Sequence, residues 1–264
     1  MVGTQEDERP KGTAQESATD RLRLVMGKAR LARVQAARVM VVGLGGVGSN
    51  CAEALARGGV GSLVLVDRDV VAPSNINRQA VAYQSTVGQA KTEVMARIVA
   101  DINPTCEVTT LRTFLSKESL VPALSALPCP DYVVDAIDTI SQKLILARWC
   151  QDEGLPLVSS MGGANKLDPT RLRFSDIGCT TNDPLARIMR KECRKRGIRH
   201  LEVLWSDERP QEPEGKAVAL DEGGFVREGA SILGTMSYLP PIMGQMIAGR
   251  VISELAGLSW GRQI

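Results

Sequence analysis

Aromatic residues and histidine are scarce in this sequence, which limits both its core and its chemistry. Phe, Trp and Tyr make up 3% of the 264 residues, so we expect a core of Val, Leu, Ile and Ala. His200 is the single histidine, which excludes mechanisms that need two imidazoles; we expect it at the start of a strand with a structural role. The 32 Lys and Arg residues nearly balance the 30 Asp and Glu residues, so no overall charge attracts nucleic acid.

Cysteine spacing and apolar runs exclude further classes of protein. The six cysteines include no C-x-x-C pair, so we expect reduced thiols, no disulfide framework and no zinc. We interpret Cys51, Cys106, Cys129 and Cys150 as packing residues, and Cys179 and Cys193 as buried or incidental thiols. The most apolar segment, Ile242–Leu258, carries Arg250 and Glu254, and no uncharged run reaches the roughly 20 residues of a spanning helix. We expect a cytoplasmic protein without a transmembrane segment and leave association with a membrane surface open.

Strands and helices alternate along most of the chain, after a polar segment at residues 1–19 that we interpret as a disordered tail. We expect strands at Arg38–Gly43, Ser62–Val66, Glu107–Leu111, Tyr132–Ala136, Leu155–Ser159, Arg171–Ser175 and Leu201–Trp205. We expect helices at Asp20–Ala37 (with Asp20 as a candidate N-cap), Val47–Arg57, Val87–Asp101, Ser116–Leu124, Thr139–Glu153, Asp183–Arg196 and Met236–Leu258, and a long loop at Ser206–Ala230. The pattern predicts one α/β domain over residues 20–264: a mostly parallel sheet with helices on both faces, extended by a mixed-strand C-terminal region.

A glycine-rich turn follows the first expected strand and opens the next helix. The segment Gly43-Leu-Gly-Gly-Val-Gly48 has the spacing G-x-G-x-x-G, in which glycines let the backbone approach phosphates and helix N–H groups face an anion. Asp67 ends the second strand 19 residues after Gly48, where a carboxylate accepts hydrogen bonds from ribose hydroxyls. Together these features predict a Rossmann-like nucleotide site, but the motif alone does not select the nucleotide.

Further polar residues at the same sheet edge favour ATP over a nicotinamide dinucleotide. Asn75, Asn77 and Arg78 follow Asp67 closely, and Lys91 begins the next helix. Arg78 and Lys91 supply the positive charge that a triphosphate needs. Asp138 follows the Tyr132–Ala136 strand, where a carboxylate can hold Mg²⁺ together with waters and phosphate oxygens. Each residue alone could be a solvated side chain or a helix cap, but together they favour a site.

This ordered set of motifs resembles the adenylating superfamily of ubiquitin-activating enzymes and the molybdopterin and thiamine sulfur-carrier adenylases, called ThiF/MoeB-like. The resemblance covers about residues 20–264. It implies that Gly43, Gly45, Gly46 and Gly48 line ATP, that Asp67 binds the ribose, that Asn75, Asn77 and Arg78 contact phosphate and ribose, that Lys91 clamps the phosphates, and that Asp138 holds Mg²⁺. It also implies a homodimer in which Arg21, with Arg23 as its rival, reaches the triphosphate of the neighbouring subunit.

Within that superfamily the second half is most similar to the tRNA threonylcarbamoyladenosine dehydratases. The similarity rests on Gly162-Gly163, Asp168-Pro-Thr170, Ser175-Asp176, Asp183-Pro-Leu-Ala-Arg187, Ser206-Asp-Glu-Arg-Pro210 and Gly234-Thr-Met-Ser-Tyr-Leu-Pro-Pro241. It implies a nucleotide-binding half at residues 20–160 and a substrate and dimerisation half at 161–264. It also implies that a carboxylate on tRNA is adenylated and then attacked by the modification's own carbamoyl group. AMP leaves as the ring closes, the net change is the loss of one water driven by ATP, and no enzyme cysteine is required.

A basic helix in the second half is a candidate tRNA-binding surface. Residues 187–199 carry seven cations and one acid, a net charge of +6 over 13 residues. The cations Arg187, Arg190, Lys191 and Arg194 fall on one helical face, which fits phosphate-backbone binding. No aromatic residues lie between them, so they predict positioning rather than base readout. The alternative is a solvated helix face.

Three other functions stay open. The first is adenylation of the C-terminal glycine of a ubiquitin-like sulfur-carrier protein, with a sulfur-relay protein as partner; the missing C-x-x-C pairs disfavour it. The second is a non-catalytic nucleotide-binding partner, which would be free to lose Arg78, Lys91 and Asp138. The third is a nicotinamide oxidoreductase, which does not explain Arg78 and Lys91 together.

Overall fold

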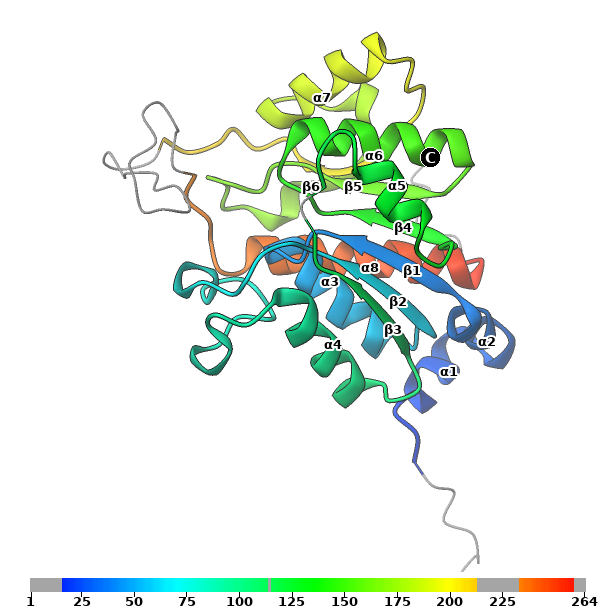
Figure 1. Ribbon diagram of the computed structural model, residues 1–264. Coiled ribbons are helices and arrows are strands. Elements are labelled where there is room, and N and C mark those ends of the chain that lie inside the picture. The colour runs from blue at the N-terminus through cyan, green and yellow to red at the C-terminus, as the bar shows by residue number, and fades with distance from the viewer. Residues whose placement is uncertain (1–15, 114, 213–232, 259–264) are drawn as a thin grey trace, which may run out of the picture.

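The computed structural model describes residues 16–113, 115–212 and 233–258, which fold around one seven-stranded sheet (Figure 1). The order across the sheet is β3-β2-β1-β4-β5-β7-β6. The strands are β1 (Arg38–Val42), β2 (Ser62–Val66), β3 (Glu107–Leu111), β4 (Tyr132–Asp135), β5 (Leu157–Ser160), β6 (Leu172–Asp176) and β7 (Glu202–Ser206). Neighbouring strands are parallel except β6 and β7, which run antiparallel. The expected α/β fold with a mixed-strand C-terminal region is confirmed.

Helices cover both faces of the sheet, as Figure 1 shows. They are α1 (Asp20–Met26), α2 (Lys28–Ala36), α3 (Gly46–Arg57), α4 (Lys91–Ile102), α5 (Leu120–Ser125), α6 (Ile140–Glu153), α7 (Pro184–Lys195) and α8 (Leu239–Ala256). Successive residues of β1 alternate between two aliphatic cores. Val39 and Val41 pack in the core with α2, α3, α4 and α8. Met40 and Val42 pack in the core with α5 and α6.

The expected single helix at residues 20–37 is two helices. Gly27 lies between α1 and α2 with φ of +80°, a left-handed conformation that glycine adopts readily and that ends the first helix. Asp20 is also not the N-cap. Thr19 holds that position, and Asp20 lies in the first turn, where its carboxylate accepts a hydrogen bond from the Ser17 N–H.

Three other expected helices begin later than their sequence patterns indicate, one of which is α8, which begins at Leu239 rather than Met236. Gly88, with φ of +83°, donates its N–H to the carbonyl of Val71, so the chain before α4 belongs to a loop and α4 begins at Lys91. Before α5, the hydroxyls of Ser116 and Ser119 bond to nearby backbone N–H groups, so that segment is a turn. Residues 1–15 of the expected tail and residues 213–230 of the expected long loop lie outside the described residues.

The cysteines and the histidine differ from expectation at two positions. Cys51, Cys106, Cys150 and Cys193 are buried, but Cys129, interpreted as a packing residue, is exposed, as is Cys179. Burial raises the pKa of Cys193 to about 11 and that of Cys106 to about 11. His200 lies before β7 rather than at its start, and its side chain is 93% exposed. Among the helices in the described ranges, none is long and apolar enough to cross a bilayer.

Candidate functional site

A pocket of about 460 Å³ opens where the carboxyl ends of β1, β2 and β4 meet. The chain passes from β1 to β2 on one side of β1, whereas β4 lies on the other side of β1. The strand order therefore reverses at β1, and the pocket lies at this switch point, where open α/β sheets bind ligands. Its walls include eight of the expected site residues: Gly43, Gly45, Gly46, Asp67, Asn75, Arg78, Lys91 and Asp138. The second half of the chain contributes Gly163, Ala164, Thr235, Pro240 and Met243. Both halves therefore build one cavity.

The glycine turn forms the floor between β1 and α3. Gly45 is the N-cap of α3 and has no side-chain cap, so the first N–H groups of the helix are free to bind an anion. A Cβ on Gly43, whose φ is +92°, would lie 2.7 Å from the carbonyl oxygen of Ala136. Gly48 does not line the pocket; a Cβ there would lie 1.8 Å from the carbonyl oxygen of Gly43, so Gly48 lets α3 pack against the turn.

Asp67 fixes the turn from the end of β2. Its carboxylate accepts hydrogen bonds from the backbone N–H of Leu44 at 2.5 Å and of Asp69 at 2.7 Å. Burial raises the pKa of Asp67, while the Lys91 ammonium and the two backbone hydrogen bonds oppose that increase. The Asp67 carboxylate is therefore a half-buried hydrogen-bond acceptor at the pocket wall, and its two bonds to backbone N–H groups fix its position.

Three cations that follow β2 line the pocket, Arg68, Arg78 and Lys91, and the last two are the expected ones. Lys91 is 5% exposed, and its Nζ lies 3.1 Å from a carboxylate oxygen of Asp69. Arg78 donates from Nη1 to the carbonyl of Ser74 at 3.0 Å and to Oδ1 of Asn77 at 2.7 Å, and burial lowers its pKa. Asn77 does not line the pocket; it holds Arg78, and its Nδ2 donates to the carbonyl of Thr235 at 3.1 Å.

Gln79 is a pocket residue that the sequence reasoning missed. It follows Arg78, is 7% exposed and lines the cavity. Its Oε1 atom is buried and has no hydrogen-bond partner among the described residues. A buried acceptor without a donor is costly, so its position at a cavity wall makes Gln79 a candidate acceptor for a bound ligand. Its position directly after Arg78 was the available signal.

A buried ion pair positions the turn that carries Asp138, and the sequence reasoning also missed this pair. Lys143 and Asp135 are fully buried, and the Lys143 ammonium donates to Asp135 at 3.1 Å and to the Ser159 hydroxyl at 3.2 Å. Asp135 also accepts the N–H of Ile137, which fixes the turn that carries Asp138. Asp138 itself is exposed at the pocket. A lysine within the apolar stretch of α6 was the signal for this pair.

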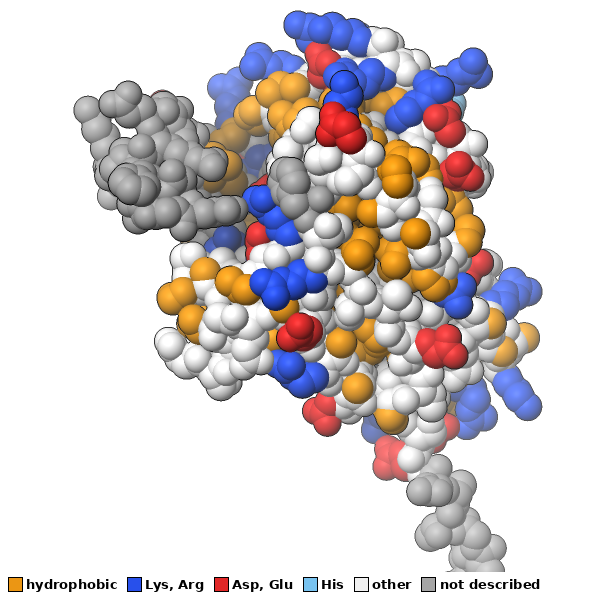
Figure 2. Space-filling model, in the orientation of Figure 1, with side chains coloured by type: hydrophobic (Ala, Val, Ile, Leu, Met, Phe, Trp, Pro, Cys, Tyr) orange, Lys and Arg blue, Asp and Glu red, His pale blue; other side chains and the backbone are white. Residues whose placement is uncertain are grey.

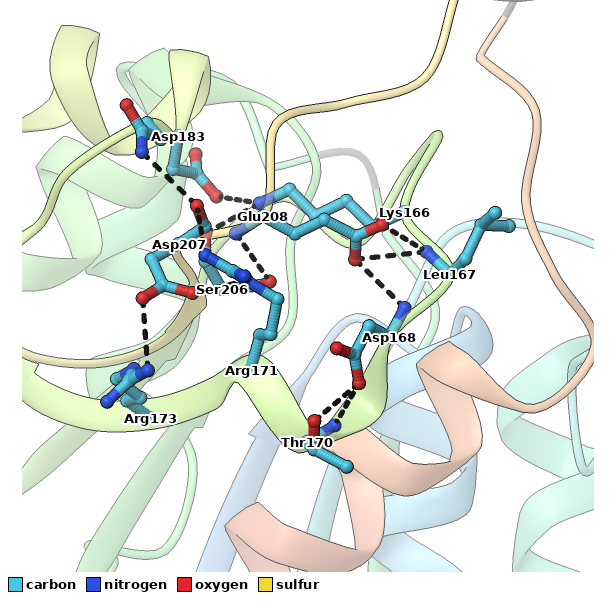
Figure 3. A network of polar contacts seen from close by, with 11 residues as sticks. Lys166, Leu167, Asp168, Thr170, Arg171, Arg173, Asp183, Ser206, Asp207 and Glu208 are labelled. Carbon is cyan, nitrogen blue, oxygen red and sulfur yellow. Dashed lines mark hydrogen bonds and ion pairs between the residues drawn. The ribbon is translucent and has the colours of Figure 1, made fainter.

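A second buried network ties the pocket wall to the basic helix (Figure 3). Lys166 is 1% exposed; its Nζ donates to Oδ2 of Asp183 at 2.8 Å and to the carbonyl of Ser206 at 3.0 Å. The other oxygen of Asp183 caps α7 by accepting the N–H of Ala186. The Glu208 carboxylate accepts the two backbone N–H groups that follow Lys166. The network thus joins the segment after β5, the end of β7 and the start of α7.

Helix α7 presents three of its four expected cations to solvent. Arg187, Lys191 and Arg194 are exposed, and Figure 2 shows Lys and Arg side chains gathered at the end of the molecule where α7 lies. Arg190 is half-buried, because its guanidinium donates to the carbonyl and the hydroxyl of Thr180. The opposite face of α7 buries Ala186, Met189 and Cys193.

Arg21 lies away from the pocket of its own chain. It is an exposed residue of α1, and Thr19 and Leu22 of the same segment pack near Gly59, just before β2 begins. Figure 1 shows α1 and α2 at the end of the sheet where β1 starts, whereas the pocket lies where β1 ends. Within one chain, Arg21 is therefore not part of the cavity.

Comparisons with known proteins agree with this geometry. The chain is 42% identical over 236 residues to tRNA threonylcarbamoyladenosine dehydratase of Bacillus subtilis, a match that covers 88% of this chain and 92% of the relative. It is similar to the solved structure of Escherichia coli tRNA N6-threonylcarbamoyladenosine dehydratase in complex with ATP, with a TM-score of 0.76, 29% identity, and coverage of 92% of this chain and 98% of that one. The chain is 37% identical over 123 residues to the molybdopterin-synthase adenylyltransferase of Salmonella typhimurium, a match that covers 47% of this chain and 48% of the relative. Residues 19–261 match the model of one family, so the chain belongs to the ThiF family.

Proposed function

We propose that this chain catalyses the ATP-dependent dehydration of threonylcarbamoyladenosine in tRNA through an acyl-adenylate. The observation that carries the proposal is a cavity with the parts that adenylation needs, in a chain that is similar to a dehydratase over 88% of its length. Similarity to the molybdopterin adenylyltransferase covers only 47% of the chain. In this proposal residues 20–160 bind the nucleotide, and residues 161–264 bind the substrate and the second subunit.

Adenylation requires alignment and charge neutralisation rather than an enzyme nucleophile. The carboxylate of the modification is already ionised at neutral pH and attacks the α-phosphate of ATP. The free N–H groups at the start of α3 bind phosphate oxygens, and Asp67 accepts hydrogen bonds from the ribose. Arg78 and Lys91 stabilise the charge that develops on the leaving pyrophosphate. Lys91 is already paired with Asp69, so it is held in position before ATP arrives.

The second step closes a ring on the adenylate. The carbamoyl group of the same modification attacks the activated carbonyl carbon, AMP leaves, and the net change in the tRNA is the loss of one water. The exposed Cys129 and Cys179 do not line the pocket, so neither has a role in this scheme.

Asp138 fits a magnesium ion that takes most of its ligands from water and phosphate. Mg²⁺ is usually held by one or two carboxylates plus substrate phosphates, and Asp138 is an exposed carboxylate on the pocket wall. In the described ranges no cluster of three or more His, Cys, Asp or Glu residues could hold a metal, so Mg²⁺ would take at most two ligands of these types from the described residues, with Asp138 as one of them. When bound, Mg²⁺ would neutralise phosphate charge during pyrophosphate departure.

A homodimer would bring Arg21 to the pocket of the other subunit. Arg21 lies outside its own pocket, and the same helix exposes Leu24 by 80% and Val25 by 86%. Exposed aliphatic side chains beside a cation are suited to an interface that delivers that cation to a partner. We therefore assign Arg21 to the triphosphate of the neighbouring subunit.

The α7 cations position the tRNA. Arg187, Lys191 and Arg194 face solvent and bind phosphates of the tRNA backbone. The Arg190 guanidinium is hydrogen-bonded to Thr180, so it supports the helix rather than binding phosphate. A tRNA substrate is also the reason to expect this protein in the cytoplasm. The second candidate, adenylation of a sulfur-carrier protein, is favoured by partial similarity such as that to the molybdopterin relative.

The test is turnover of ATP to AMP with Mg²⁺ and tRNA bearing threonylcarbamoyladenosine, followed by mass spectrometry of the nucleosides. We expect a product lighter by one water from the wild type and none from Lys91→Ala or Asp138→Ala. Arg57→Gln, which changes an exposed residue of α3 paired with Glu53, is the matched control and should act as the wild type does. Unchanged tRNA, combined with pyrophosphate exchange that depends on a ubiquitin-like carrier, would replace this proposal with the second candidate.

A further inference from the structure

In the described part of the chain, two aromatic side chains are exposed, and both lie at the same end of the molecule. Among the described residues, the aromatic side chains exposed to solvent are Tyr83, at 57%, and Tyr238, at 38%. The other described aromatic residues are buried or half-buried: Tyr132, Trp149, Trp205 and Phe174. In a sequence with 3% aromatic residues, two exposed rings near one cavity call for an explanation.

Both rings belong to segments that adjoin pocket residues. Tyr238 lies between Thr235 and Pro240, which line the cavity. Tyr83 lies in the loop that follows the pocket residues Arg78 and Gln79 and leads to α4. The two segments touch, because the Asn77 side chain donates to the carbonyl of Thr235 at 3.1 Å. Figure 1 shows both segments, in cyan and orange, at the same end of the sheet.

The structure anchors the Tyr238 ring and orders the loop that carries Tyr83. The Tyr238 hydroxyl donates to the carbonyl of Leu167 at 2.8 Å, which anchors one end of the ring and leaves part of its apolar body exposed. The backbone N–H of Tyr83 donates to the Thr86 hydroxyl at 2.9 Å. The base of that loop is closed by hydrogen bonds between Val71 and Gly88 and between Val71 and Gln89. An anchored ring and an ordered loop lose less conformational entropy when they bind a flat partner.

Exposed aliphatic side chains extend each ring into a larger apolar surface. Leu167 and Met236, beside Tyr238, are 45% and 39% exposed, and Val87, near Tyr83, is 38% exposed. Figure 2 shows hydrophobic side chains on the protruding loop at this end of the molecule. This apolar surface lies beside the cavity in which ATP is expected to bind, so the part of the substrate that reaches ATP must pass close to it. Nucleic acid bases have flat apolar faces that stack on such rings.

RNA geometry supplies the reason for two platforms. An adenosine that reaches ATP in the pocket must leave the base stack, so its neighbours on both sides lose a stacking partner. Single-stranded RNA loops are recognised by stacking unpaired bases on aromatic side chains, which is tolerant of sequence. We propose that Tyr83 and Tyr238 are stacking platforms for the unpaired bases that flank the modified adenosine in its tRNA loop. This inference rests on the proposed function, and it separates base stacking beside the pocket from backbone contacts on α7.

The test measures stacking directly, on the full-length protein. An RNA stem-loop carries 2-aminopurine next to the adenosine position, because the fluorescence of this base reports its stacking. Wild-type protein should change the fluorescence, and Tyr83→Leu or Tyr238→Leu should reduce that change and weaken RNA binding about 5- to 150-fold. Tyr83→Phe and Tyr238→Phe keep the ring and should restore most of the binding.

Each outcome decides the inference. Equal RNA affinity of the Leu variants and the wild type would overturn it, as would an equal loss in ATP affinity, which would show that the substitutions damaged the pocket. Weaker binding of a carrier-protein C-terminal peptide, with RNA binding unchanged, would also overturn it in favour of a protein occupant. If the wild type binds and stacks the stem-loop but does not dehydrate tRNA, the proposed function fails while the platform stands.

Discussion

The ammonium nitrogen of Lys166 lies 2.8 Å from a carboxylate oxygen of Asp183, and neither side chain is more than 1% exposed. The pair links two segments with different tasks. Lys166 follows Gly163 and Ala164 in the pocket wall, and Asp183 caps the helix that carries the exposed cations. The contact therefore fixes the position of the pocket wall relative to α7, the expected tRNA-binding surface.

Removing one partner of this pair should destabilise the protein strongly. Lys166→Met leaves the Asp183 carboxylate buried without a cation, which costs about 3–5 kcal/mol in the free energy of unfolding. The double variant Lys166→Met/Asp183→Asn removes both charges and should recover part of that loss. Urea denaturation of the wild type, Lys166→Met, Asp183→Asn and the double variant completes the cycle. Lys195→Ala, which removes an exposed cation paired with Glu192, should change stability by less than about 0.5 kcal/mol. An additive double variant would contradict a direct coupling.

Two glycines of the phosphate turn should respond differently to alanine. A Cβ on Gly48 would lie 1.8 Å from the Gly43 carbonyl oxygen, so Gly48→Ala forces α3 away from the turn and should lower the melting temperature by several degrees. A Cβ on Gly45 meets nothing within 4 Å, so Gly45→Ala should fold normally and weaken ATP binding by filling the cavity. Thermal unfolding and ATP titration separate the two effects. Equal melting temperatures for both variants would show that Gly48 has no packing role.

The pH dependence of ATP binding should reveal the raised pKa of Asp67. Burial raises this pKa, so Asp67 takes up its proton at a higher pH than an ordinary aspartate as the solution is acidified. The protonated form is a poorer acceptor for ribose, so ATP affinity should fall through that window, and Asp67→Asn should remove this dependence. The same raised pKa makes ionised Asp67 a cost to folding that is absent at low pH and appears as the pH rises through the folded pKa. ATP titrations from acidic to neutral pH measure the effect; identical profiles for the variant and wild type would exclude this role.

Gln79 should show opposite effects on stability and on nucleotide affinity. Its buried Oε1 has no partner in the described part of the chain, so Gln79→Met removes a desolvation cost and should raise the free energy of unfolding without ATP by about 1 kcal/mol. The variant also removes an acceptor from the pocket wall and should weaken ATP binding roughly tenfold. Denaturation without ligand and calorimetric titration with ATP make the two measurements. If ATP affinity does not change, the orphaned acceptor does not face the nucleotide.

The exposed cations of α7 should govern the salt dependence of tRNA binding. Replacing Arg187, Lys191 and Arg194 by Gln should weaken binding and reduce the slope of log affinity against log salt by about one for each phosphate that the protein no longer neutralises. ATP affinity should stay the same, because none of the three lines the pocket. Filter binding at several salt concentrations gives the slope, and Arg57→Gln, which removes one exposed cation from α3, is the control that should leave the slope unchanged. A slope unaffected by the triple change would place the tRNA elsewhere.

Local patterns in the sequence were sufficient to predict most of the fold. Short apolar strands such as Ser62–Val66 were located to the residue, because a buried parallel strand is a continuous aliphatic run between turn residues. The break at Gly27 was missed because the apolar spacing continues across it, and only its φ of +80° separates the two helices. Eight expected pocket residues do line the cavity.

Long-range polar contacts were not accessible to the same reasoning. Lys143 and Lys166 resemble solvated cations in the sequence, because their partners Asp135 and Asp183 lie on other elements. Gln79 was overlooked because only the three-dimensional structure shows that its buried Oε1 has no hydrogen-bond donor nearby. Such groups become visible only when the three-dimensional neighbours are known.

The central position of β1 also determines the order in which the molecule can assemble. β1 meets β2 after a single helix, but its contact with the β4 side joins residues 93 positions apart, Arg38 and Asp131. Closing the longer loop costs more chain entropy, so the β1–α3–β2 unit can form early while the β1–β4 pairing waits. Because the cavity lies between the ends of these strands, a chain that has formed only its local contacts already contains the glycine turn, yet it has no nucleotide site.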